Sequence, residues 1–213
     1  LSYMFRNLLY ILLISVLPAC AWQPEKQHND SEQLGKAIEY FQSEKYHEAM
    51  IIFRQLDKTY RLNPHFKAYL GVCFYYEWDY EKAAAHLDES IPQLRSFAPH
   101  ERSFYYYADA ESHFNLKQYA EAIPLYEMML TVCYPNERAE ALFKLGLCYA
   151  FTNKWNNSYD YLTSSLAYYE TFDNSRQKAR ISQIKNMIGG CMQHLDLEND
   201  TINGTNIFNI YTR

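Results

Sequence analysis

The chain of 213 residues has the length of one domain or two small ones. Hydrophobic residues make up 48% of it and aromatic residues 17%, including 21 tyrosines, and this composition excludes a chain that is disordered throughout. The net charge is −5 and no basic cluster occurs, so the sequence predicts no binding of nucleic acid, which depends on grouped Lys and Arg.

The first 21 residues have the pattern of an export signal. Met4 is the expected start, and it is followed by one basic residue, Arg6, and by an apolar run at positions 8–17. This run is shorter than the roughly 20 residues that span a bilayer, and it fits the apolar core of a signal peptide. We therefore expect residues 1–21 to be a signal peptide.

The sequence Leu17–Cys20 (Leu-Pro-Ala-Cys) ends the apolar run and resembles a bacterial lipobox. The resemblance implies that Cys20 is lipidated, becomes the first mature residue and anchors the protein to the membrane. The expected location is then the envelope of a Gram-negative bacterium, as an outer membrane lipoprotein or in the periplasm. Ala19–Ala21 also fits an ordinary signal peptidase site, which would release a soluble protein. The polar residues 22–32 that follow predict a linker.

Between residues 33 and 198 the sequence contains four copies of one pattern. Each copy has an aromatic anchor three positions before a small residue, and the anchors are Tyr46, Tyr80, Tyr119 and Trp155. Successive anchors are 34, 39 and 36 residues apart. Nine positions before the anchors lie the small residues Ala37, Gly71, Ala110 and Gly146, and seven positions after them lie the large residues Phe53, Leu87, Tyr126 and Leu162. Small residues let two helices approach closely and large apolar residues fill the space between them, so each copy predicts a pair of packed helices.

This pattern resembles the tetratricopeptide repeat (TPR), a pair of antiparallel helices of about 34 residues. The closest local matches are residues 69–74, 119–126 and 145–149, and prolines at 64, 99 and 135 fall near the joins between copies. The resemblance implies an all-α fold: a right-handed superhelical solenoid of antiparallel helix pairs, with about four units and a capping helix.

The capping helix is predicted from residues 176–195. Gly189–Met192 repeats the pattern of Gly71–Phe74, and the outer positions of this segment are polar, as the exposed end of a solenoid requires. Residues 199–213 predict an irregular tail, either a short strand or an unfolded end. A truncated reading frame is the alternative, and the chain would then be the first part of a longer sensor or regulator.

In such a solenoid the first helix of each unit lines the concave face. The side chains predicted there are mostly aromatic, and aromatic rings give large contact areas at low entropic cost. The predicted groove residues are Phe41, Tyr75, Tyr76, Phe104, Tyr107, Glu111, Phe114, Phe143 and Phe151. Glu111 is the polar member of this set. We expect a groove for a peptide or a partner protein, and packing between neighbouring units is the alternative for any one residue.

The sequence contains no pattern of an enzyme, a cofactor site or a metal site. It has no HExxH, no glycine-rich phosphate loop and no GxSxG motif, and its five cysteines form no CxxC pair. Asp109, Glu111 and His113 lie close together on one predicted helix, but residues two apart do not share a helix face. We therefore predict no catalytic residue, no metal and no cofactor.

The leading hypothesis is a non-catalytic scaffold, anchored in the envelope as a lipoprotein, that binds a peptide or partner protein in an aromatic concave groove. One alternative is a sensory or regulatory TPR module of a larger or truncated regulator. Another is a soluble secreted binder of a small ligand or glycan, with the aromatic side chains as a stacking platform.

Overall fold

The structure of the protein, a computed structural model, describes residues 24–61, 63–172 and 177–211, with side chains for residues 29–61, 63–171 and 177–196. The expected signal peptide and its lipidation site, Cys20, lie outside the described residues. The regular elements of the described part of the chain are all helices, and no strand occurs among them. The prediction of an all-α fold is confirmed.

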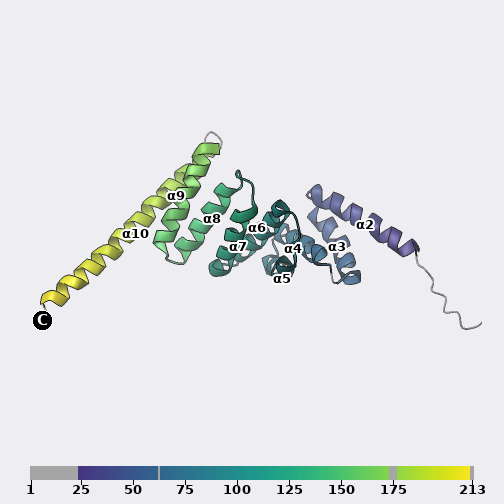
Figure 1. The fold of residues 1–213 in the computed structure, drawn as a ribbon, viewed down its shortest axis with the longest axis horizontal. Helices are drawn as coiled ribbons and strands as arrows, with labels where there is room; N and C mark the ends of the chain where they lie inside the picture. The colour runs from purple at the N-terminus through teal and green to yellow at the C-terminus, as the bar shows by residue number, and fades with distance from the viewer. Residues whose placement is uncertain (1–23, 62, 173–176, 212–213) are drawn as a thin grey trace, which may run out of the picture.

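The helices form four antiparallel pairs followed by a single helix (Figure 1). In chain order they are α2 (Pro24–Gln42), α3 (Tyr46–Thr59), α4 (Pro64–Tyr76), α5 (Tyr80–Ser90), the short 3-10 helix η1 (Ile91–Gln93), α6 (Pro99–Asn115), α7 (Tyr119–Val132), α8 (Arg138–Phe151), α9 (Trp155–Phe172) and α10 (Lys178–Tyr211). From α2 to α10, each α-helix packs against the next one along the chain, and α4 also packs against α6. The elongated stack, with α2 at one end and α10 at the other, confirms the predicted solenoid of helix pairs with a capping helix (Figure 1).

The same turn joins the two helices of every pair. The four aromatic anchors are the first residues of α3, α5, α7 and α9. Two positions before each anchor the backbone is left-handed, with φ between 56 and 61°, at Glu44, Trp78, Lys117 and Asn153. In the third pair, Lys117 donates its N–H to the Phe114 carbonyl at 3.0 Å, and Gln118 donates to the His113 carbonyl at 2.9 Å. Equivalent bonds in the other pairs form the same Schellman motif, which satisfies the carbonyl groups at the end of each first helix.

The small and large residues of the repeat meet across each helix pair. A Cβ atom placed on Gly71 would lie 2.5 Å from Leu87 Cγ, and one placed on Gly146 would lie 2.6 Å from Leu162 Cγ. Both distances are far shorter than a carbon–carbon contact, so the two helices are as close as glycine allows. The large residues at this position, Phe53, Leu87, Tyr126 and Leu162, are all fully buried.

Ser158 replaces the alanine of the other repeats and is fully buried. Its hydroxyl donates to the Gly146 carbonyl at 2.8 Å, and the Cys191 thiol donates to Ser158 Oγ at 3.3 Å. Ser158 therefore connects α8, α9 and α10 through hydrogen bonds.

Three cysteines, Cys73, Cys148 and Cys191, are each buried in a different part of the core. Burial raises the pKa of Cys73 and of Cys148 to about 12. Both side chains remain thiols at neutral pH and pack as small hydrophobic groups.

Both ends of the solenoid differ from the prediction. A linker was expected at residues 22–32, but α2 begins at Pro24, because proline suits a first helical position where its missing N–H has no partner in any case. The predicted irregular tail at 199–213 is wrong over residues 199–211, because α10 continues to Tyr211 (Figure 1). That stretch contains no proline, and a helix that already exists extends with one hydrogen bond for each added residue.

Gly189 and Gly190 of α10 do not repeat the close contact of Gly71 and Gly146. A Cβ atom on Gly189 or Gly190 would meet no atom within 4 Å outside its own helix. Only Cys191 follows the earlier pattern, because it is buried against the fourth pair.

Substitution by alanine should change the free energy of unfolding in opposite directions at these two kinds of glycine. Gly146→Ala should lower the free energy of unfolding by about 1–3 kcal/mol, because the new methyl group overlaps Leu162. Gly189→Ala should raise it by about 0.5–1 kcal/mol, because alanine is the better helix former and nothing blocks its Cβ. Urea unfolding followed by circular dichroism measures both. Equal effects of the two substitutions would contradict the close helix contact at Gly146.

Candidate functional site

A cavity of about 760 Å³ opens on the side of the stack that carries the first helices of the pairs. Its lining comes mainly from α2 and α6, with single residues from α4, α7 and α8 and a contribution from the segments that precede α6 and α8. The apolar and aromatic residues that line it are Ile38, Phe41, Tyr69, Phe104, Tyr105, Tyr107, Met129 and Tyr134. A volume of this size accommodates a small molecule or a few side chains of a peptide.

Phe41 connects the first helix pair to the second and third. Its ring centre lies 5.0 Å from that of Tyr69 on α4 and 6.1 Å from that of Phe104 on α6. Both contacts are edge-to-face, an arrangement that aromatic rings prefer because of their quadrupoles. Tyr69 is itself stacked on Phe53 of α3 at 4.7 Å. Tyr69 therefore connects the aromatic residues that line the cavity, called the aromatic wall below, to the core.

The tyrosines of this wall remain neutral hydrogen-bond donors. Burial raises the pKa of Tyr69, Tyr105 and Tyr107 above its usual value. The carboxylate of Glu101 adds to the rise for Tyr69 and Tyr105, and that of Glu111 adds to it for Tyr107. A negative phenolate is disfavoured both by low polarity and by a nearby negative charge.

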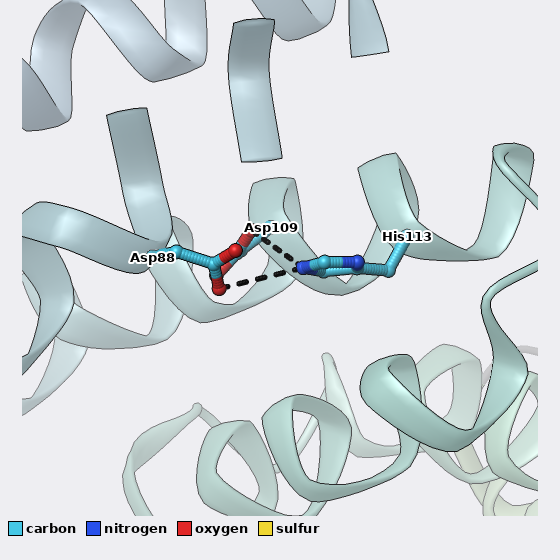
Figure 2. A group of neighbouring side chains, drawn as sticks. All are labelled: Asp88, Asp109 and His113. Carbon is cyan, nitrogen blue, oxygen red and sulfur yellow. Dashed lines mark hydrogen bonds and ion pairs between the residues drawn. The ribbon is translucent and has the colours of Figure 1, made fainter. Parts of the chain in front are cut away.

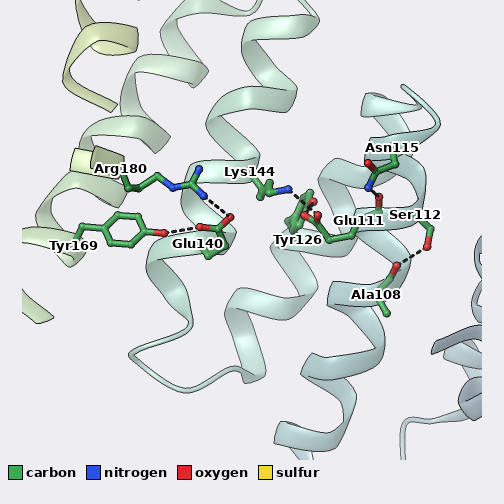
Figure 3. Close-up of polar contacts among 9 residues, drawn as sticks. All are labelled: Ala108, Glu111, Ser112, Asn115, Tyr126, Glu140, Lys144, Tyr169 and Arg180. Atoms are coloured by element: carbon green, nitrogen blue, oxygen red, sulfur yellow. Dashed lines mark hydrogen bonds and ion pairs between the residues drawn. The ribbon is translucent and has the colours of Figure 1, made fainter. Parts of the chain in front are cut away.

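Three carboxylates line the same cavity, those of Glu101, Glu137 and Glu140. Glu137 Oε1 lies 3.3 Å from His100 Nε2, and Glu140 Oε1 lies 3.5 Å from an Arg180 guanidinium nitrogen (Figure 3). Among the described residues that line the cavity there is no Lys or Arg. The cavity therefore combines aromatic walls with an excess of acidic groups.

The structure brings three of the predicted groove residues, Phe41, Phe104 and Tyr107, into this cavity. It does not bring in Tyr75, Tyr76, Phe114 or Phe151, which lie at the ends of first helices beside the turns. There the aromatic rings cover one another: Tyr76 stacks on Tyr46 at 3.9 Å, and Phe151 stacks on Tyr119 at 4.6 Å.

Glu111 is not an exposed handle in a groove, so this prediction is wrong. Its side chain is buried, and it accepts hydrogen bonds from the Tyr126 hydroxyl and, at 2.7 Å, from Lys144 Nζ (Figure 3). The position faces the next helix pair rather than the cavity. Glu111 thereby joins α6 to α8 through an ion pair and to α7 through the hydrogen bond from Tyr126.

Phe143 is also wrongly predicted as a groove residue, because it is only 1% exposed. It packs in the core that α8 and α9 share with α10. The guanidinium of Arg180, on α10, lies 4.1 Å from its ring centre. The capping helix therefore covers the face on which Phe143 lies.

The three carboxylates were not among the predicted groove residues, because those were chosen only from the inward positions of the first helices. Glu101 lies in the first turn of α6, and Glu137 immediately precedes α8. A signal for both exists in the sequence: the pattern Pro-x-Glu occurs at 99–101 and again at 135–137. Because proline marks the joins between units, this repetition places two carboxylates at equivalent points of the stack.

Comparisons with known proteins agree with this architecture. Residues 140–171, in the fourth helix pair, match the family model described as tetratricopeptide repeat. A solved structure of MamA (residue 41 to the end) from Desulfovibrio magneticus RS-1 superposes with a TM-score of 0.59 at 14% identity, covering 82% of this chain and 96% of that one. MamA AMB-1 gives a TM-score of 0.62 at 14% identity, covering 84% and 94%. A putative kinesin light chain with TPR-like repeats from Podosopora anserina gives 0.55 at 14% identity, covering 83% and 95%. No curated protein matches the sequence.

The fold is therefore a TPR-like all-α solenoid. Within it, the fourth helix pair carries the sequence of a tetratricopeptide repeat. At this level of identity the structural similarity establishes the fold alone. None of the helices within the described residues has the length and apolar character needed to cross a membrane.

The buried ion pair between Glu111 and Lys144 gives a direct test of the contact between the third and fourth pairs. Lys144→Ala should lower the free energy of unfolding by about 3 kcal/mol, because it leaves a buried carboxylate without its cation. The double variant Glu111→Gln/Lys144→Met should regain most of this loss, since it buries no charge. Urea unfolding at neutral pH measures all three proteins. If Lys144→Ala unfolds like the wild type, the pair does not hold these units together.

Proposed function

We propose that the protein is a non-catalytic scaffold that binds a short segment of a partner protein in the cavity between α2, α6 and α8. The observation that carries the proposal is the combination of aromatic walls and acidic groups in a cavity of about 760 Å³ on the inner side of the stack. The TPR-like fold supports it, because a stack of helix pairs creates an extended concave surface suited to a ligand segment.

The chemistry of the lining defines the partner segment. Phe41, Phe104 and Tyr107 offer apolar ring faces, which favour an apolar side chain and also attract cations. Glu101 and Glu137 add carboxylates that face no Lys or Arg among the described lining residues. The segment that fits is therefore an apolar residue flanked by Lys or Arg. The volume suits a few side chains and not a folded domain.

The second part of the proposal concerns location. We propose that the protein is exported and anchored by a lipid on Cys20 in the envelope of a Gram-negative bacterium. The support for this part is the sequence alone: an apolar run at 8–17 followed directly by Leu17–Cys20. The anchor would leave the solenoid free to recruit a partner at the membrane surface.

The binding proposal predicts a preference for basic peptides. We expect fluorescein-labelled 12-residue peptides with a central Leu or Phe flanked by Lys or Arg to bind more tightly than the same peptides with Glu in place of the basic residues. Fluorescence anisotropy at about 50 mM salt measures the difference, because exposed charges are screened at higher ionic strength. Equal binding of both peptide sets would contradict the proposal.

A matched pair of variants locates the binding. Gln42 is exposed and lines the cavity, whereas Gln55 is exposed on α3, the second helix of the same pair. Gln42→Arg should weaken binding of basic peptides about two- to fivefold through charge repulsion. Gln55→Arg makes the same charge change outside the cavity and should leave binding close to that of the wild type. A similar loss in both variants would mean that binding occurs elsewhere.

Lipidation predicts a mass and a membrane affinity that depend on Cys20. The protein, expressed from Met4 in a Gram-negative host, should partition with membranes and show a lipid-sized increase over the mass of the chain that begins at Cys20. Cys20→Ala should lose both properties. A soluble mature chain that begins at Trp22, without lipid, would overturn the anchor and leave the peptide-binding proposal untouched.

A further inference from the structure

A cluster of three metal-ligating side chains lies where the second helix pair meets the third. Asp88 comes from α5, and Asp109 and His113 come from α6 (Figure 2). Asp109 and His113 are four residues apart and therefore share one face of the helix. The sequence analysis considered only the spacing of two residues through Glu111, which points away toward α8, and so it missed this cluster.

Asp109 is the most unusual member of the cluster. Its side chain is 0% exposed, and neither of its carboxylate oxygens has a hydrogen-bond partner. Burial, with a smaller contribution from Asp88, raises the pKa of Asp109 to about 8. A buried carboxyl group without hydrogen bonds is costly, and buried carboxylates are normally paired with cations or coordinated to metals. The two buried oxygens of Asp109, which have no hydrogen-bond partner, are therefore available to bind a positive ligand at this point.

His113 is oriented as a ligand for the same point. The side-chain oxygen of Gln118 lies 2.7 Å from His113 Nδ1, and because an amide oxygen can only accept, Nδ1 carries the proton. The other ring nitrogen, Nε2, faces Asp88 and Asp109 (Figure 2), and its lone pair can bind an ion placed between them. A metal-binding histidine commonly donates its other N–H in this way to an acceptor that fixes the ring.

The distances fit a tetrahedral ion. His113 Nε2 lies 3.4 Å from Asp88 Oδ1 and 3.6 Å from Asp109 Oδ1, and the ligand atoms of all three residues lie within 4.8 Å of one another. Ligands about 2.0–2.2 Å from Zn²⁺ in tetrahedral geometry are about 3.3–3.6 Å apart. The side chains can therefore close on such an ion with small movements.

The site is also accessible. The side chain of Asp88 is 57% exposed, whereas those of His113 and Asp109 are 9% and 0% exposed. An ion can therefore enter from the side of Asp88 and bind to the two buried groups. Water on the exposed side can supply the fourth ligand.

We propose that Asp88, Asp109 and His113 bind one divalent first-row transition-metal ion, for which Zn²⁺ is the representative. Imidazole and carboxylate together suit this class of ion, whereas Mg²⁺ and Ca²⁺ prefer ligand sets made only of oxygen. The ion connects α5 to α6 and so ties the second helix pair to the third. Its role is structural, and it is independent of the peptide bound in the cavity.

The test titrates Zn²⁺ into the full chain, freed of metal with a chelator, by isothermal calorimetry. We expect one ion per chain and a rise in the melting temperature with Zn²⁺ concentration, because a ligand that binds only the folded state stabilises it. Asp88→Asn, Asp109→Asn and His113→Gln should each weaken binding more than about tenfold, since the loss of even an outer-shell partner costs 10–100-fold. Asp88→Asn is the informative variant if the buried ones fail to fold, because Asp88 is exposed.

Two controls separate this site from adventitious binding. His47→Gln removes an exposed histidine on α3, outside both the cluster and the cavity, and should leave Zn²⁺ affinity unchanged. Co²⁺ should give the visible absorption of a tetrahedral ion without the near-ultraviolet band of a thiolate ligand. The absence of that band would exclude the cysteines as ligands of the ion. The proposal is overturned if no Zn²⁺ binds, if binding survives Asp88→Asn unchanged, or if the Co²⁺ spectrum shows thiolate ligation. In those cases His113 and the two carboxylates form only an ion pair.

Discussion

The close approach of the two helices in each pair is the constraint on which the rest of the structure depends. Where Gly71 meets Leu87 and where Gly146 meets Leu162, no Cβ atom fits between the helices. This contact fixes the separation of the helices, and the Schellman turn fixes where the second helix begins. Once both are set, the side chains on the outer faces of a pair can pack only against the neighbouring pair, so the units stack in one direction.

Polar groups then determine how neighbouring pairs meet. Between the third and fourth pairs one such contact is the ion pair of Glu111 with Lys144, and between the second and third one is the contact of His113 with Asp88 (Figures 2 and 3). Buried charges are costly unless they are paired, so each contact tolerates only a narrow range of positions for its partner helix. We infer that apolar packing holds each pair together and that these charged groups select the register between pairs.

The sequence was sufficient for the elements that repeat and insufficient for those that occur once. The spacing of anchors, small residues and large residues predicted the helix pairs and their contacts, because each position appears four times. Glu111 was misplaced because it lies on the same helix face as Tyr107 but one turn further along, where Tyr126 and Lys144 cover it, and periodicity alone does not show where a neighbouring helix covers a face. Phe143 was misplaced because α10, rather than solvent, covers it. The contact of Asp88 with His113 joins residues 25 positions apart on separate helices, and no local pattern encodes it.

Helix α6 is the element that links these features. One face of it carries Phe104 and Tyr107 into the cavity and, one turn beyond Tyr107, Glu111 toward α8, whereas the opposite face carries Asp109 and His113 toward α5. The helix has about 3.6 residues per turn, so Glu111 is separated from Tyr107 along the axis, whereas Asp109 and His113 are separated from both by direction around the axis. Any shift of α6 along its axis would therefore change the cavity wall and both charged contacts together. The contact of Glu111 with Lys144 and that of His113 with Asp88 therefore hold α6 in the position that the aromatic wall requires.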